Sequence, residues 1–308
     1  MTMVNYIIYR LLQIIPVLLL LSIVVFGLLH IAGGDPARLI AGETASREDI
    51  EAIRAKFGLD KPIHIQYGIW LGHVLSGDLG NSIVTRRPVT AEIADRIWPT
   101  VELATTAMFL ATLVGIAVGI VSAVRQYSLL DHLSMVMALF GVSTPIFWLG
   151  LMLIYLFAVE LRWLPSGGMG SLKALILPSI TLGAASAAIV ARMTRSSLLE
   201  VIRQDYIRTA RAKGLPERTV LLRHSLKNAF IPIVTVIGLQ YGYLLGGTVV
   251  TETVFSRPGI GRMLVNAITT RDFPVVQGTI MVLAVTFVIV NLVVDLIYIY
   301  LDPRIHYD

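Results

Sequence analysis

The sequence predicts an all-α integral membrane protein with six membrane-spanning helices. Hydrophobic residues make up 56% of its 308 residues, and charged residues make up only 15%. Soluble domains carry about 25% charged residues, so this chain lacks the polar surface that a water-soluble fold needs. The apolar residues are also concentrated in six stretches that contain no Asp, Glu, Lys or Arg. Composition and pattern therefore both indicate the membrane class.

Each uncharged stretch is about as long as a helix that crosses a bilayer. Such a helix rises ~1.5 Å per residue, so ~20 residues cross a hydrocarbon core of ~30 Å. The stretches comprise residues 11–34, 103–124, 132–159, 174–191, 228–251 and 273–294. The fourth has 18 residues, and its flanking Lys173 and Arg192 can extend to the interface.

The first stretch is predicted to be a retained anchor rather than a cleaved signal peptide. It is too long for a signal peptide, and no Ala-x-Ala site follows it. It ends in Gly33-Gly34-Asp35-Pro36, a pattern that stops one helix and opens the next.

The charges between the stretches predict the orientation. Residues 192–227 hold nine Lys or Arg and three acidic residues, and positive charge resists translocation. This loop and both termini are therefore expected to be cytoplasmic. Residues 31–98 carry eight basic and nine acidic residues, and at 68 residues this segment exceeds the short loops that the charge rule governs.

Residues 31–98 are expected to form a small helical extracytoplasmic segment. Ser46-Arg47-Glu48-Asp49 resembles a helix N-terminus, and Ile50, Ile53 and Phe57 follow at helical spacing up to Gly58. A second helix is predicted over residues 63–75, and an amphipathic surface helix over 88–98. The segment serves either as a packed cap over the bundle or as a docking face for an external partner.

Small residues recur every four positions along three of the predicted spans, which favours close helix packing in lipid. They are Ala107, Ala111, Gly115, Gly119 and Ala123; Ser179, Gly183, Ala187 and Ala191; and Gly238, Gly242 and Gly246. These ribbons either form static seams or let helices slide. Pro145, Pro178 and Pro232 interrupt spans and are candidate kinks.

Several function classes are disfavoured by what the sequence lacks. It has no cysteine, and its histidines are scattered, so no metal site is predicted. The His-Glu-x-x-His and Gly-x-Ser-x-Gly motifs of an intramembrane enzyme are missing. A stand-alone secondary carrier is disfavoured because no inverted repeat and no set of coupling carboxylates is evident. The net charge of +5 reflects cytoplasmic loops rather than nucleic-acid binding.

The loop between the fourth and fifth spans is the most informative stretch. Residues 205–216 read DYIRTARAKGLP, which predicts a short basic helix stopped by Gly214, with Pro216 opening a second helix up to about Asn228. Thr209, Ala210 and Ala212 are small, so another protein's surface could pack closely against the first helix. A solvated juxtamembrane helix is the alternative.

This loop resembles the EAA loop of ABC importer permeases, whose pattern is Glu-Ala-Ala, three residues, then Gly. Arg208, Thr209 and Ala210 take the first three places and Gly214 the last. The chain departs from the pattern at Arg208, at Thr209, and at Lys227 where the pattern ends in Pro. YIRTARAKG is similar to the form found in dipeptide, oligopeptide and nickel permeases.

Further similar segments extend over the whole chain. They are GDPARLIAG from Gly34, ARMTRSSLLEV from Ala191, NAFIPIVTVIGLQ from Asn228 and TETVFSRPGIGR from Thr251. Within the family, GDPARLIAG and WLPSGG from Trp163 most resemble the glutathione-type member.

The resemblance implies a single permease domain over residues 1–308, with an extracytoplasmic segment (31–98), a five-helix core (99–301) and a cytoplasmic coupling loop (199–228). It implies a multi-pass protein of the bacterial inner membrane that imports short peptides. A second permease, two ATP-binding cassette ATPases and an extracytoplasmic binding protein would be its partners. No Gly-Lys dipeptide occurs, so no P-loop is present and ATP and Mg are expected on the ATPases.

Three sets of candidate residues follow from the resemblance. The loop residues expected to couple to the ATPases are Tyr206, Arg208, Thr209, Ala210, Lys213 and Gly214. Those that could line the pathway are Ser143, Thr144, Gln240, Tyr241 and Tyr243. Those that could contact the binding protein, from a turn-rich projection that is alternatively a structural turn, are Ser256, Arg257, Pro258 and Gly259. Nickel or a sugar oligomer remains an alternative cargo.

Overall fold

The computed structural model describes residues 3–31, 37–38, 45–56 and 58–301. These residues form helices and connecting turns, with an isolated bridge between Asn81 and Pro88. The predicted all-α architecture is confirmed for this part of the chain. The chain divides into two units, Met1–Thr100 with Pro258–Ile289, and Val101–Arg257 with Val290–Asp308, which are described separately.

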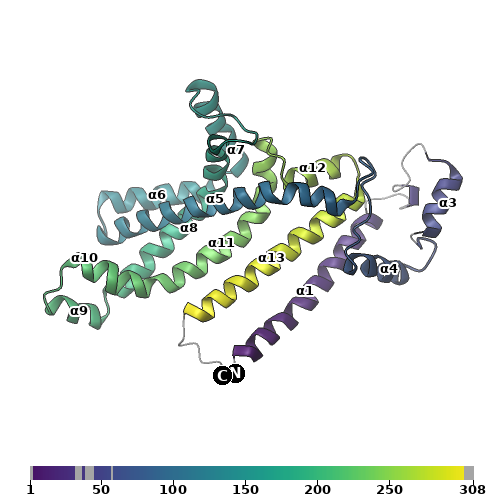
Figure 1. The fold of residues 1–308 in the computed structure, drawn as a ribbon. Coiled ribbons are helices and arrows are strands. Elements are labelled where there is room, and N and C mark those ends of the chain that lie inside the picture. Colours follow the sequence, from purple (N-terminus) through teal and green to yellow (C-terminus); the bar gives the residue numbers. More distant parts are fainter. Residues whose placement is uncertain (1–2, 32–36, 39–44, 57, 302–308) are drawn as a thin grey trace. The chain divides into compact units, whose positions relative to one another are not determined.

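The first unit contains α1 (Met3–Ile31), α3 (Arg47–Lys56), α4 (Ile63–Leu75) and α12 (Ile260–Thr269), together with the start of α5 (Val89–Val124) and most of α13 (Phe273–Leu301) (Figure 1). The capping pattern predicted for α3 is confirmed, since the Ser46 hydroxyl accepts a hydrogen bond from the Asp49 amide and the Asp49 carboxylate accepts one from the Ser46 amide. The helix predicted over residues 63–75 is also present. The Gly33-Gly34-Asp35-Pro36 stop lies outside the described residues.

The core of the first unit forms where α5, α12 and α13 meet. Val89 and Ile93 of α5 pack with Ile260 and Met263 of α12 and with Val276 of α13. The separate surface helix predicted over 88–98 is wrong, because α5 continues through Pro99 for 36 residues. Proline removes only one backbone donor, and buried side chains on both sides of it, Val89 and Leu103 among them, hold the two halves in one helix.

The second unit contains the rest of α5, α6 (Leu129–Ser143), α7 (Ile146–Leu153), the π-helix η1 (Ile154–Glu160), α8 (Leu172–Ile202), α9 (Asp205–Ala212), α10 (Glu217–Thr219), the π-helix η2 (Val220–Ser225) and α11 (Leu226–Val254). Its core joins Leu103 and Ala107 of α5, Leu182 and Val190 of α8, and Ile233 of α11.

The small-residue ribbons of α5 and α8 face each other at backbone contact distance. A Cβ added at Gly119 would lie 2.5 Å from Thr194 Cβ and 2.7 Å from the Ala191 carbonyl oxygen. A Cβ at Gly183 would lie 2.7 Å from the Ala107 carbonyl oxygen, and one at Gly115 would lie 2.8 Å from the Ala187 carbonyl oxygen. The predicted close packing of these two spans is confirmed. In the third ribbon the glycines differ from one another. A Cβ added at Gly238 would lie against the Val294 side chain, whereas a Cβ added at Gly246 would have no atom within 4 Å.

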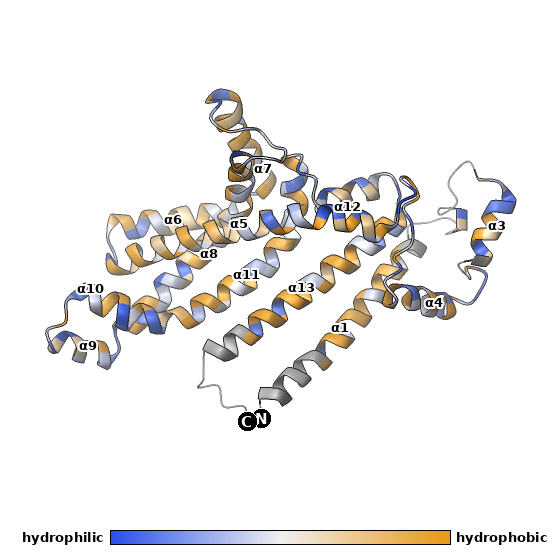
Figure 2. Ribbon diagram, in the orientation of Figure 1, coloured by the Kyte–Doolittle hydropathy of each residue, from blue (hydrophilic) through white to orange (hydrophobic). Residues whose placement is uncertain are grey.

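Four helices are long and apolar enough to cross a membrane: Val89–Val124, Leu172–Ile202, Glu217–Val254 and Phe273–Leu296. α1 contributes a shorter apolar helix, Leu12–Leu28, which falls below the length of these four within the described residues. Figure 2 shows apolar residues along all of these helices, and hydrophilic residues gathered where α9, α10 and the start of α11 lie. The described residues therefore support four spans, or five if a bent helix pair counts as one.

That pair occupies the third predicted span, which is not a continuous helix. α6 and the α7–η1 segment meet at an angle of 107°. The break falls at Thr144 and Pro145, because proline disfavours helical geometry at the residue before it and Thr144 adopts an extended conformation. The kink predicted at Pro145 is confirmed, and the bend of 107° is much sharper than that of an ordinary proline kink. Pro178 and Pro232, by contrast, lie inside helices that continue through them.

Candidate functional site: the α9 loop

The loop predicted to couple to a partner forms a compact helical turn at the end of α8. α8 ends at Ile202, and α9 begins three residues later at Asp205 (Figure 1). Gly214 has a φ of +75°, in the left-handed region where glycine ends a helix without strain. Pro216 then caps α10, as predicted. The second helix does not end near Asn228, however, because α10, η2 and α11 follow one another without a break.

The inner face of α9 is fixed by a small apolar cluster. Ile207 and Ala210 lie one helical turn apart and pack with Val220 of η2, and Val201 of α8 covers the cluster. All three members are buried, Ala210 with 7% of its surface exposed. The Ala210 side chain faces the interior of the chain, so its part in coupling stays a prediction. Ala210 holds α9 in place.

One ion pair joins the end of α9 to the start of α10. The Arg211 guanidinium donates from Nε and Nη2 to the two Glu217 carboxylate oxygens at 3.1 and 2.6 Å. This hydrogen bonding raises the pKa of Arg211, so the guanidinium stays charged. The pair joins the last turn of α9 to the first residue of α10 across Gly214. The turn therefore has a defined shape rather than a freely moving one.

The outer face of α9 carries the remaining predicted coupling residues. Arg208, Thr209 and Lys213 are exposed, and the Arg208 side chain is 76% exposed with its guanidinium 3.5 Å from Asp205. The Tyr206 hydroxyl accepts a hydrogen bond of 2.9 Å from the Asn228 side chain. Four of the six residues thus lie on a surface that a second protein could contact. Gly214 shapes the turn beneath it.

The five residues predicted to line a pathway lie at the α6–α7 break and on α11. Ser143 and Thr144 lie at the break between α6 and α7. On α11, Gln240 accepts a hydrogen bond of 3.1 Å from Ser186, the Tyr241 hydroxyl lies 2.9 Å from that of Thr105, and Tyr243 is exposed. Gln240 and Tyr241 therefore join α11 to α8 and α5. Their role in a pathway stays a prediction.

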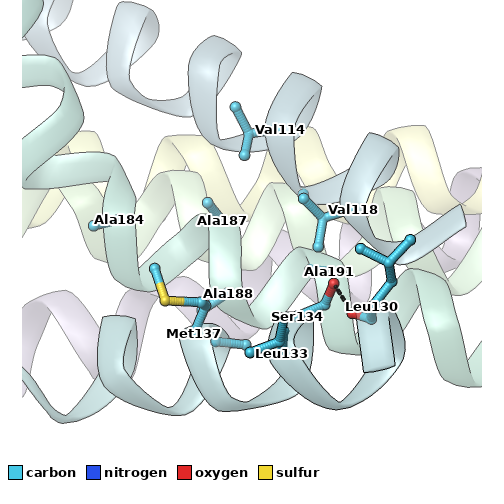
Figure 3. Close-up of a pocket in the computed structure, with 12 residues that line it drawn as sticks. Val114, Val118, Leu130, Leu133, Ser134, Met137, Ala184, Ala187, Ala188 and Ala191 are labelled. Atoms are coloured by element: carbon cyan, nitrogen blue, oxygen red, sulfur yellow. Dashed lines mark hydrogen bonds between the residues drawn. The ribbon is translucent and has the colours of Figure 1, made fainter. Parts of the chain in front are cut away.

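An apolar pocket of about 400 Å³ lies between α5, α6 and α8 (Figure 3). Its walls include Val118 of α5, Met137 of α6 and the alanines of α8 from Ala184 to Ala191. Ser134, its one hydroxyl-bearing wall residue, donates its proton to the Leu130 carbonyl oxygen. None of the predicted pathway residues lines this pocket.

Comparison with known proteins decides the family. The family described as "Binding-protein-dependent transport system inner membrane component" matches residues 115–307, and the N-terminal component of the same systems matches residues 3–104. Glutathione transport system permease proteins GsiC from Salmonella typhimurium strain LT2 and Escherichia coli strain K12 are each 49% identical over 305 residues, which cover 99% of this chain and 100% of each relative. The chain belongs to this permease family.

Solved structures agree with this membership at the level of the fold. The permease resembles the inward-facing MetNI methionine ABC transporter with a TM-score of 0.57 and 21% identity, covering 68% of this chain and 96% of that one. An amino acid ABC transporter gives a TM-score of 0.55 at 16% identity. The prediction of a permease subunit rather than an enzyme is confirmed by these relationships.

The loop that follows α11 contains a turn fixed by a buried Arg257. The Arg257 side chain is buried and its Nη2 contacts the carboxylate of Glu102. The preceding Ser256 takes a positive φ of 52°, which reverses the chain. Gly259 is also buried, whereas Ser256 and Pro258 are exposed. A contact with a binding protein stays a prediction for these residues, of which Ser256 and Pro258 are exposed.

One polar cluster of the permease was missed by sequence reasoning. Asp131, at the start of α6, is buried and accepts hydrogen bonds from Arg195 of α8 and from Ser122 of α5. Asp131 lies just outside an uncharged stretch, and the 64 positions that separate it from Arg195 give no pairing signal. A buried aspartate implies a charged partner, but the sequence does not show that Asp131 is buried.

Proposed function

We propose that this permease is a pathway-forming subunit of an ATP-driven importer of short peptides, with glutathione as the first candidate substrate. The observation that carries the proposal is 49% identity over the full length of glutathione transport permeases. A match over whole chains includes the α9 loop, the spans and the outer segment together. Substrate class is therefore inferred from the entire permease rather than from one motif.

Energy enters this importer from outside the chain, at the exposed face of α9. Arg208, Thr209 and Lys213 are presented there, while the opposite face is packed on Val220 and the ends are tied by Arg211 and Glu217. Two ATPase subunits, which bind ATP and Mg, move this helix when they close. A second permease completes the pathway, and an extracytoplasmic binding protein delivers the peptide.

The permease lies in the bacterial inner membrane with six spans and both termini in the cytoplasm. Counting α1 as a full span, and α6 with α7–η1 as one broken span, adds two to the four long apolar helices. The basic residues around α9, Arg203, Arg208, Arg211 and Lys213 among them, support a cytoplasmic position for this loop.

Reconstitution of the complete importer tests this function. The permease is incorporated into liposomes with the proposed partners: a second permease, two ATPases and a binding protein. Labelled glutathione, a dipeptide, nickel and a sugar oligomer are then offered in turn. We expect glutathione or dipeptide uptake that requires both ATP and the binding protein. Uptake of nickel or sugar alone, or uptake without the ATPases, would contradict the proposal.

A further inference from the structure

A buried charge cluster at one end of the second unit ties three helices together. The Arg195 guanidinium donates from Nε and Nη2 to the two Asp131 carboxylate oxygens, each at 2.7 Å. The Ser122 hydroxyl donates to the same carboxylate, and the Tyr127 amide donates to it at 2.9 Å. Asp131 is 3% exposed. The described contacts thus surround one carboxylate with four donors from α5, the α5–α6 turn and α8.

The turn between α5 and α6, which supplies the Tyr127 amide, is itself constrained. Tyr127 has a φ of +63°, in the left-handed region that a non-glycine residue adopts only with strain. The Ser128 hydroxyl accepts a hydrogen bond of 3.3 Å from the Asp131 amide and so caps α6. Such strain persists where surrounding contacts determine the conformation, and here the carboxylate supplies those contacts.

The cluster lies on the helix that leads directly to α9. Arg195 is in the last third of α8, which ends at Ile202, and only two residues separate that end from α9. Along the same face, glycines bring the helices to backbone contact: Gly115 and Gly119 join α5 to α8, and Gly141 lies 3.3 Å, measured from an added Cβ, from the Ala184 carbonyl oxygen of α8. Close packing along the helices and the charge cluster at their end therefore hold α5, α6 and α8 in one arrangement.

We propose that Arg195 and Asp131 are positioning residues that make α5, α6 and α8 move as one rigid body with α9 when the importer turns over. Removing Arg195 would leave Asp131 as a buried carboxylate without its charged partner, and the start of α6 would separate from α8. The motion of α9 would then be absorbed there instead of reaching the rest of the permease. This inference rests on the proposed entry of energy at α9.

Spin-label distance measurements on the complete importer test the rigid body directly. The permease contains no native cysteine, so Leu129→Cys at the start of α6 and Glu200→Cys at the end of α8 provide exposed, unique labelling sites. We expect the same narrow α6–α8 distance distribution with no nucleotide and with ATP trapped by vanadate. A wild-type distance that changes between these two states would overturn the inference, while ATP-dependent uptake by the same sample would leave the proposed function intact.

Substitutions of Arg195 provide the second measurement. Arg195→Met is expected to broaden the α6–α8 distribution and to reduce substrate transported per ATP by roughly fivefold or more, the lower end of typical coupling effects. Arg195→Lys keeps the charge but not the two-pronged hydrogen bond, so it should recover part of both readouts. If Arg195→Met keeps a narrow distribution and normal transport per ATP, the inference is wrong. If the importer with Arg195→Met fails to assemble, the Arg195→Lys variant and the wild-type α6–α8 distances test the inference instead.

Discussion

Replacing Gly214 with valine is expected to reduce uptake roughly five- to thirty-fold while ATP hydrolysis continues. No heavy atom lies within 4 Å of a Cβ added at Gly214, so space is not the constraint. The constraint is its φ of +75°, which a β-branched residue adopts only at a cost of about 1–2 kcal/mol or more. That energy corresponds to roughly the stated change in population. The turn would open and α9 would shift away from its position on Val220.

Gly214→Asn is the matched control for this experiment. Asparagine adds a side chain of similar size to that of valine but enters the left-handed region far more readily. We therefore expect Gly214→Asn to keep most of the uptake, measured with ATP hydrolysis on the same proteoliposomes. Equal losses in the two variants would show that the conformation of Gly214 is not what matters. Normal uptake in Gly214→Val would count against the α9 turn as the coupling element.

Replacing Gly119 with alanine is expected to cause the largest loss of stability among single-methyl additions to the helix ribbons. The added methyl carbon would lie 2.5 Å from Thr194 Cβ and 2.7 Å from the Ala191 carbonyl oxygen of α8. The carbonyl belongs to a helix backbone and cannot move alone, so α5 and α8 must separate. Overpacking of this kind costs about 1–3 kcal/mol. The thermal unfolding midpoint of the detergent-solubilised permease should fall by several degrees, on the order expected for that energy.

Gly246→Ala adds the same methyl group to another ribbon glycine and provides the control. No atom lies within 4 Å of that position, and alanine has the higher helix propensity, so stability should be unchanged or slightly higher. Equal midpoints for the two variants would contradict the backbone contact between α5 and α8.

Local signals explain which parts of the fold could be predicted from sequence. The cap of α3 depends on Ser46 and Asp49, three positions apart, and the α9 turn depends on Gly214 and Pro216. Both patterns act through backbone atoms only a few residues away. The same holds for α4, whose predicted bounds agree with Ile63–Leu75. Such elements can be recognised without knowledge of the tertiary structure.

The errors arose where tertiary contacts outweigh local preferences. Pro99 does not end α5 because residues before and after it are buried in the two units, whereas Pro145 produces a bend of 107°. Sequence alone does not separate the two cases. The sequence did not show that Ala210 and Arg257 are buried, Ala210 against Val220 and Arg257 against Glu102. Whether a single side chain is buried depends on tertiary packing, which the local sequence does not specify.

Site-specific cross-linking of α9 to an ATPase subunit tests most directly whether work enters the permease through this helix. Thr209→Cys places a reactive group on the exposed face of α9, and Leu172→Cys places one at the exposed first residue of α8. Leu172 is at the first end of the 31-residue α8, and α9 follows its other end, Ile202. At 1.5 Å per residue the two ends of α8 lie roughly 45 Å apart. We expect Thr209→Cys, but not Leu172→Cys, to form a cross-link with the ATPase in the assembled importer. If Thr209→Cys forms none, or Leu172→Cys cross-links equally well, energy does not enter through α9.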